Sequence, residues 1–129
     1  MMRLHHIGVA CRDIEAEIEK LSQIHGIAAR TEVVHDSVQD ASLALLTMED
    51  GTRIELVAGP RVETLVRKNI GLYHLCFEVV DLGAEIDRLV SAGAKLLAAP
   101  APAVLFQGCE VAFLYVSYGI VELLSQNPV

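Results

Sequence analysis

The chain repeats itself once, and this repeat limits the folds open to it more than any other feature. When the sequence is shifted by 68 positions, seven residues near the start of the first half meet identical residues in the second half. The matched pairs are Leu4 with Leu72, His6 with His74, Asp13 with Asp81, Ala16 with Ala84, Glu17 with Glu85, Ile18 with Ile86 and Leu21 with Leu89. The halves also end alike, since Gly51–Val57 resembles Gly119–Leu124. One structural unit is therefore predicted to occur twice.

Each half has the pattern of a strand, a helix and three further strands. Segments rich in β-branched and aromatic residues predict strands, and apolar residues three or four positions apart predict helices. The predicted first-half strands are 4–11, 28–35, 41–48 and 52–58, with a helix over 13–25. The predicted second-half strands are 72–80, 95–99, 109–116 and 119–125, with a helix over 81–92. Asp13 and Asp81 stand as N-caps, and Gly26 and Gly93 stand where the helices should end.

These elements predict an α+β fold made of two βαβββ modules. We expect a single domain over residues 1–129, with module one at about 1–60 and module two at about 69–129. The sheet should be curved, partly open, eight-stranded and barrel-like, with both helices outside. The joining stretch 59–70 should contain a helical turn at Val62–Arg67.

Composition excludes several classes of protein. A net charge of −7 argues against nucleic acid or an anionic membrane as partner. No apolar run is long enough to span a bilayer, and no basic segment followed by an apolar segment marks a signal peptide. The three cysteines are odd in number and irregularly spaced, which is typical of reduced thiols. A cytoplasmic protein is therefore expected.

Four polar residues recur at matching places in the two halves. Glu55 and Glu122 are acids within apolar strands, where a carboxylate is costly unless it is paired or bound to a metal. His6 and His74 lie in the first strand of each half. Taken singly, each histidine would be an ordinary structural residue, and Glu55 could form a salt bridge with Arg53. The repetition instead favours a common role.

Two imidazoles and two carboxylates form a mixed nitrogen and oxygen site for one divalent ion. Such a donor set suits Zn, Ni, Co, Mn or Fe, and four protein ligands would leave positions open for substrate. The remaining histidines, His5, His25 and His35, are interpreted as structural or solvent-facing. Arg67 and Lys68 are possible anion contacts, although solvated linker charge is the simpler interpretation.

The sequence resembles the vicinal oxygen chelate superfamily, in its glyoxalase I and methylmalonyl-CoA epimerase branch. The resemblance covers nearly the whole chain and rests on four segments, one around each of the four polar residues. These segments are Leu4–Ala10 with Arg53–Val57, Gly71–Val79, and Val121–Leu123. In those enzymes a His, a Glu or Gln, a second His and a Glu bind the metal, which implies His6, Glu55, His74 and Glu122 here.

The resemblance implies a metal-dependent lyase or isomerase of glyoxalase I type. A proton next to a carbonyl would be removed and a metal-stabilised enediolate formed, with Glu122 and Glu55 as candidate bases. The ion would be Ni, Co, Zn or Mn, and the substrate a small thiol adduct or an acyl thioester. A homodimer is expected.

The alternatives differ in chemistry. A methylmalonyl-CoA epimerase-like enzyme is the nearest, although the strand Ala41–Leu46 lacks an acid to serve as that enzyme's extra base, and Tyr115–Tyr118 replaces its His-Pro-Lys-like segment. A ring-cleaving dioxygenase is disfavoured, because those relatives are generally longer. A non-catalytic binding protein of the bleomycin-resistance type is disfavoured by the complete set of four ligands.

Overall fold

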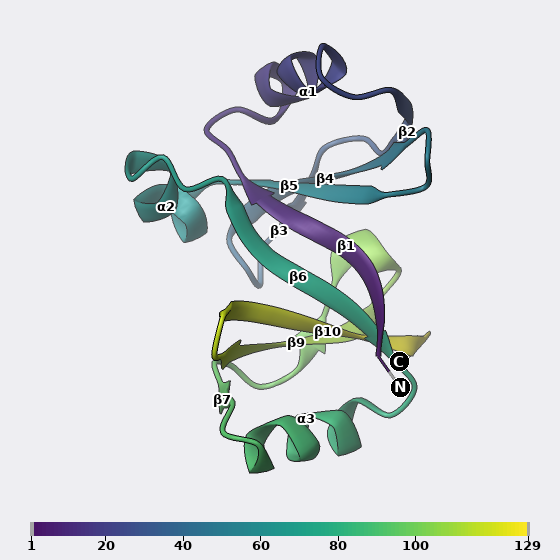
Figure 1. Cartoon of the computed structure of the whole chain (residues 1–129), viewed down its shortest axis with the longest axis vertical. Helices are drawn as coiled ribbons and strands as arrows, with labels where there is room; N and C mark the ends of the chain where they lie inside the picture. Colours follow the sequence, from purple (N-terminus) through teal and green to yellow (C-terminus); the bar gives the residue numbers. More distant parts are fainter. Residues whose placement is uncertain (1, 129) are drawn as a thin grey trace. The chain divides into compact units, whose positions relative to one another are not determined.

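The computed structural model describes residues 2–128, which contain ten strands and three α-helices. These residues fall into two compact units (Figure 1). One unit is His6–Tyr73, and the other combines the described residues before His6 with those from His74 onward. The expected module boundaries near residues 60 and 69 stay a prediction.

The unit His6–Tyr73 contains a mixed sheet. Its strands run in the order β2, β4, β5, β1, and β3 also pairs with β4. The pairing of β1 with β5 is parallel, whereas β4 pairs antiparallel with β5, β2 and β3. The elements are β1 (Arg3–Ala10), α1 (Ile14–Ser22), β2 (Ile27–Arg30), β3 (Val34–Asp36), β4 (Ala41–Met48), β5 (Arg53–Ala58), a 3-10 turn (Pro60–Val62) and α2 (Glu63–Arg67).

One face of this sheet packs against α1 (Figure 1). Ala44, Leu46 and Leu56 from that face are fully buried together with Ile14 of α1. Val9 of β1 is half-buried against this cluster, and so are Ile18 and Leu21 of α1, which belong to the apolar stripe predicted for the helix. Because side chains alternate along a strand, the other face carries Glu55 and His6. The helix thus anchors the sheet and leaves the polar pair on the opposite side.

The second unit repeats this arrangement. Its strands run in the order β6, β10, β9, β7, and β8 also pairs with β9. The pairing of β6 with β10 is parallel, and β10 pairs antiparallel with β9. The elements are β6 (Leu72–Val79), α3 (Leu82–Ser91), β7 (Lys95–Leu96), β8 (Ala101–Pro102), a 3-10 turn (Val104–Phe106), β9 (Cys109–Val116) and β10 (Gly119–Pro128).

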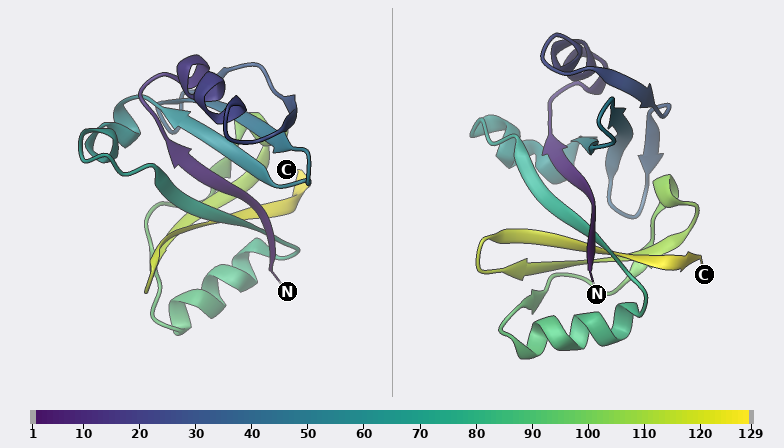
Figure 2. Two further views of the ribbon diagram at one scale, coloured as in Figure 1. Left: turned by 45° about the horizontal axis from the view of Figure 1, so that its top comes forward. Right: turned by 45° about the vertical axis from the view of Figure 1, so that its right-hand side comes forward.

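Helix α3 covers one face of the β9–β10 hairpin, as both views of Figure 2 show. Leu82 and Ile86 of α3 join Leu114 and Leu123 in a buried cluster. Phe77 of β6 is half-buried against that cluster, which agrees with the strand face assigned to it from the sequence. His74 therefore lies on the face away from α3.

Both predicted N-caps are confirmed. The carboxylates of Asp13 and Asp81 each accept a hydrogen bond of 3.0 Å from the backbone N–H three residues on, at Ala16 and Ala84. Gly93 ends α3 as expected, with a φ of 105° in the left-handed region. The predicted end of the first helix is wrong. The helix α1 stops at Ser22. Ile24 in the following turn is 71% exposed, so a further helical turn would gain no stabilisation from packing.

Eight strands were expected and ten are found among residues 2–128, because one predicted strand divides and one short strand, β8, lies outside the predicted ranges. The predicted strand 28–35 becomes β2 and β3. Between them the hydroxyl of Thr31 accepts a hydrogen bond of 2.9 Å from the N–H of Leu45, in place of a regular ladder bond. The predicted strand 95–99 shortens to β7, since Pro100 and Pro102 have no N–H to donate. The predicted helical turn at Val62–Arg67 is confirmed by α2.

None of the helices among residues 2–128 has the length and apolar character needed to cross a membrane.

Candidate functional site

The first polar pair lies within the unit His6–Tyr73. Parallel pairing places Glu55 of β5 directly beside Gly8 of β1, so its carboxylate lies next to His6 on the same face. The His6 Nε2 and Glu55 Oε1 atoms are 3.6 Å apart. Both residues are buried, at 1% and 4% exposure. Gly8 has no side chain to separate them, which explains how the two can approach.

The second polar pair has the same construction. Parallel pairing places Glu122 of β10 beside Cys76 of β6, two residues after His74. The His74 Nε2 and Glu122 Oε1 atoms are 3.0 Å apart, and the two residues are 5% and 2% exposed. Phe113 packs its ring edgewise on His74, with centroids 5.7 Å apart. Each half of the repeat therefore builds one buried imidazole–carboxylate pair in one register.

The geometry of each pair suits a metal ion. Ligands about 2.0–2.2 Å from a divalent ion, at right angles to one another, lie about 3 Å apart. The nitrogen and oxygen of each pair are separated by nearly this distance. Burial of a carboxylate in apolar surroundings also demands a compensating positive charge, from a protonated imidazole or from a cation. Both pairs thus fit a mixed nitrogen and oxygen donor set of the kind that binds Zn, Ni, Co or Mn.

The sequence predicted these four residues as metal ligands, and the structure brings the two members of each pair together. That the two pairs share one ion stays a prediction, because the pairs belong to different units. The assignment of Glu122 and Glu55 as bases is likewise a prediction.

The other histidines have the roles expected of structural or surface residues. His5 is half-buried and packs edgewise against Phe106, with ring centroids 5.3 Å apart. His35 is exposed and lies 4.0 Å from a carboxylate oxygen of Asp40. His25 is exposed beyond the end of α1.

Sequence reasoning missed one buried acid, Asp36, which is 0% exposed. Its carboxylate accepts hydrogen bonds from the N–H groups of Val38 and Gln39 and from the Gln39 side chain, at 3.0–3.2 Å. These bonds close the turn between β3 and β4, a common role for Asp. The polar residues after His35 could have indicated a turn that Asp36 closes. The burial of Asp36 depends on tertiary packing, which the local sequence does not show.

Cys11 was expected to be a reduced thiol. In the structure it is a free cysteine with a buried side chain. It is 5% exposed beyond the end of β1. Burial, followed by the charges of Glu17 and Asp13, raises the pKa of Cys11 to about 11. The thiol therefore stays protonated at neutral pH and is a poor nucleophile.

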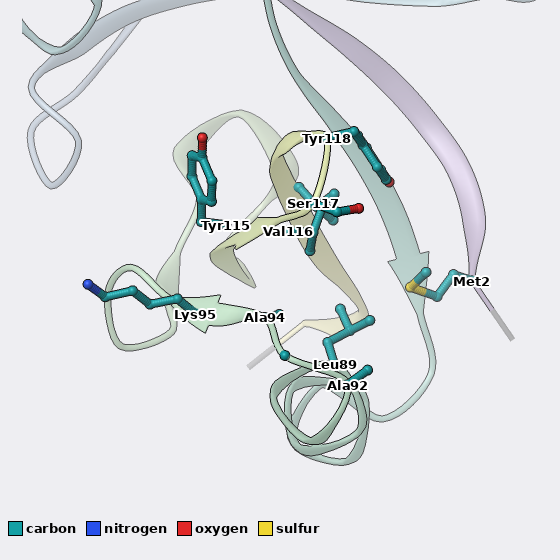
Figure 3. Close-up of a pocket in the computed structure, with 11 residues that line it drawn as sticks. Met2, Leu89, Ala92, Ala94, Lys95, Tyr115, Val116, Ser117 and Tyr118 are labelled. Carbon is teal, nitrogen blue, oxygen red and sulfur yellow. The ribbon is translucent and has the colours of Figure 1, made fainter.

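A pocket of about 500 Å³ lies on the helix side of the second unit (Figure 3). Its walls are Leu89 of α3, Ala92 just after that helix, and the hairpin segment from Tyr115 to Tyr118. Figure 3 shows Leu89, Val116 and Met2 directed toward the space and Lys95 directed away from it. Among residues 2–128, no histidine or carboxylate lines this pocket. The lining of this pocket therefore includes neither His74 nor Glu122.

The fold and the two imidazole–carboxylate pairs are compared here with known proteins. Residues 5–113 match the Glyoxalase/Bleomycin resistance protein/Dioxygenase superfamily, and the chain belongs to that superfamily. This confirms the family predicted from the sequence.

Within that superfamily, the chain is similar to methylmalonyl-CoA epimerases. The ethylmalonyl-CoA/methylmalonyl-CoA epimerase of Cereibacter sphaeroides is 30% identical over 119 residues, covering 88% of this chain and 87% of the relative.

Two solved epimerase structures share the fold. The enzyme from Mycobacterium tuberculosis superposes with a TM-score of 0.78 at 23% identity, covering 97% of this chain and 88% of that one. A variant of the Streptomyces coelicolor enzyme, in complex with 2-nitronate-propionyl-CoA, superposes with a TM-score of 0.75 at 22% identity, covering 100% of this chain and 97% of that one. The predicted fold class is confirmed. The similarities favour the epimerase alternative over the glyoxalase I prediction.

Proposed function

We propose that this protein is an epimerase that inverts the carbon next to the thioester carbonyl of a short branched acyl-CoA. The observation that carries the proposal is the duplicated pair, a buried His and Glu in the same parallel register in each half. The epimerase from Cereibacter sphaeroides supplies the reaction class.

The proposal includes one divalent ion held by His6, Glu55, His74 and Glu122. When bound, the ion would act as a Lewis acid toward the thioester carbonyl. The histidines and glutamates would hold it, while the apolar strands around them exclude water. The buried pairs at 3.6 Å and 3.0 Å support this donor set.

Inversion requires two proton transfers. A base takes the α-proton from one face, the electron pair moves into the carbonyl, and an acid returns a proton to the opposite face. The chain offers two buried carboxylates for this work, Glu122 and Glu55. We assign proton abstraction to Glu122, as the glyoxalase-like mechanism implied. Burial in apolar surroundings favours the neutral form of a carboxyl group, which strengthens Glu122 as a base.

The test is an isotope experiment in deuterated water. The protein is incubated with a single epimer of methylmalonyl-CoA, and both epimers are followed by chromatography with mass detection. We expect the second epimer to form with one deuterium at the α-carbon. Parallel incubation with a methylglyoxal–thiol adduct tests the glyoxalase I alternative, for which the product is a hydroxyacyl thioester. Binding of either compound without turnover would instead support a non-catalytic binding protein of the bleomycin-resistance type.

The proposal also covers assembly and location. We propose a homodimer in the cytoplasm. Light scattering of the purified chain and fractionation of cells that express it test these two points.

A further inference from the structure

A second pocket lies in the unit His6–Tyr73, at the carboxyl ends of β1 and β5. Its volume is about 400 Å³. Its lining includes Cys11 and Arg12 after β1, Gly59 and Pro60 after β5, and Glu63 and Arg67 of α2. We refer to it as the arginine pocket. Both arginines are exposed, so their guanidinium groups are accessible to a ligand.

Positive charge is concentrated around this pocket although the chain as a whole is acidic. The net charge is −7, yet the short segment from Pro60 to Lys68 carries three basic residues and one acid, Glu63. Arg12 adds a fourth cation from the other wall. The neighbouring acid Asp13 is engaged in capping α1, through its bond to Ala16. These positive charges would attract a polyanion to the pocket.

The pocket lies in line with the polar pair of the same unit. His6 is five residues before Cys11 on β1, and Glu55 is four residues before Gly59 on the parallel strand β5. At the rise of a strand, these intervals correspond to about 13–17 Å. An extended pantetheine arm spans a distance of this order. A ligand with its acyl end at His6 and Glu55 could thus place its nucleotide end in the arginine pocket.

We infer that the arginine pocket binds the phosphate groups of an acyl-CoA substrate, an inference that rests on the proposed function. Arg12 and Arg67 supply planar guanidinium groups, which form paired hydrogen bonds with phosphate oxygens. Pro60 and Val66 supply an apolar wall for the nucleoside. Gly59, with a φ of 118°, makes the bend that brings this wall beside β1. Glu63 opposes the anion, which limits affinity and permits product release.

The first experiment compares two substrates and three variants. R12Q/R67Q removes both cations, K20Q removes one exposed cation from α1 as a matched control, and E63Q removes the opposing acid. For methylmalonyl-CoA, we expect KM to rise about tenfold or more in R12Q/R67Q, at similar kcat. The KM for methylmalonyl-CoA should stay unchanged in K20Q and fall in E63Q. For methylmalonyl-pantetheine, which lacks the nucleotide, all variants should behave like the parent.

The second experiment does not depend on turnover. Calorimetric titration with free CoA, at low and high salt, measures binding to the parent and to each variant. We expect the parent to bind and R12Q/R67Q to bind at least about tenfold more weakly, with the difference shrinking in high salt.

The outcomes separate the two proposals. If the parent epimerises methylmalonyl-CoA but R12Q/R67Q matches it in KM and in CoA binding, the pocket assignment is wrong and the proposed function stands. If the parent binds CoA through these arginines without epimerising any thioester, the proposed function is wrong and the pocket assignment stands. Absence of CoA binding by the parent overturns the pocket assignment.

Discussion

At the scale of single residues, the two glutamates differ in the chemistry that we assign to them. Glu55 lies 3.6 Å from His6 and Glu122 lies 3.0 Å from His74, with both carboxylates buried. As ligands the two would be equivalent. Only proton abstraction distinguishes them, and substitution by Gln separates the two roles because Gln keeps an oxygen donor but cannot act as a base.

We expect E122Q to keep much of its metal while kcat falls by about two orders of magnitude or more, the usual cost of losing a general base. E55Q should retain more activity. The measurement is metal content by mass spectrometry beside kcat on methylmalonyl-CoA, with E19Q, at an exposed position of α1, as control. If E122Q stays metal-loaded and nearly as fast as the parent, the base lies elsewhere. If E55Q is the inactive variant, the roles are exchanged.

The cysteines allow a second test of residue environments. Cys11 and Cys76 are 5% and 0% exposed, whereas Cys109 is half-buried. Because the pKa of Cys11 is raised to about 11, its reactive thiolate is scarce at neutral pH. On treatment of the native protein with iodoacetamide, we expect modification of Cys109 first, as measured by peptide mass spectrometry. Equal rates at Cys11 and Cys109 would contradict the burial of Cys11.

At the scale of elements, the helix boundaries show what could be read from the sequence. Local signals succeeded: Asp13 and Asp81 cap their helices, and Gly93 ends one. Gly26 did not end the first helix, because that end depends on where the packing of α1 stops. The division of strand 28–35 at Thr31 also depends on a partner strand that no local pattern reveals.

Replacement of glycine by alanine is expected to change the free energy of unfolding in opposite directions at two positions of the second unit. Gly93 has a φ of 105°, where a Cβ is strained, so G93A should lower the free energy of unfolding by about 1 kcal/mol. Gly83 lies within α3 with ordinary space for a Cβ, so G83A should raise it by about 0.5–1 kcal/mol. Urea unfolding followed by circular dichroism measures both. Changes of the same sign in the two variants would be inconsistent with these backbone conformations.

At the scale of the whole molecule, the repeat explains why the candidate site could be predicted. A solitary buried His or Glu carries little information, but His6 with Glu55 recurs as His74 with Glu122 in the same register. What the sequence could not select was the reaction. The resemblance implies the same four-residue pattern for glyoxalase I and for the epimerases, so that choice came from the similarity to a known epimerase.

The central claim is that the two pairs bind one ion together, and metal stoichiometry tests it most directly. Cobalt is titrated into the metal-free parent and into two double variants, H6A/E55A and H74A/E122A, with binding followed by calorimetry and by the visible spectrum of the ion. We predict one ion per chain in the parent, and loss of tight binding when either pair is removed. Metal should raise the melting temperature of the parent and leave that of both variants unchanged. Two ions per chain, or one ion retained tightly after removal of a single pair, would contradict the shared site.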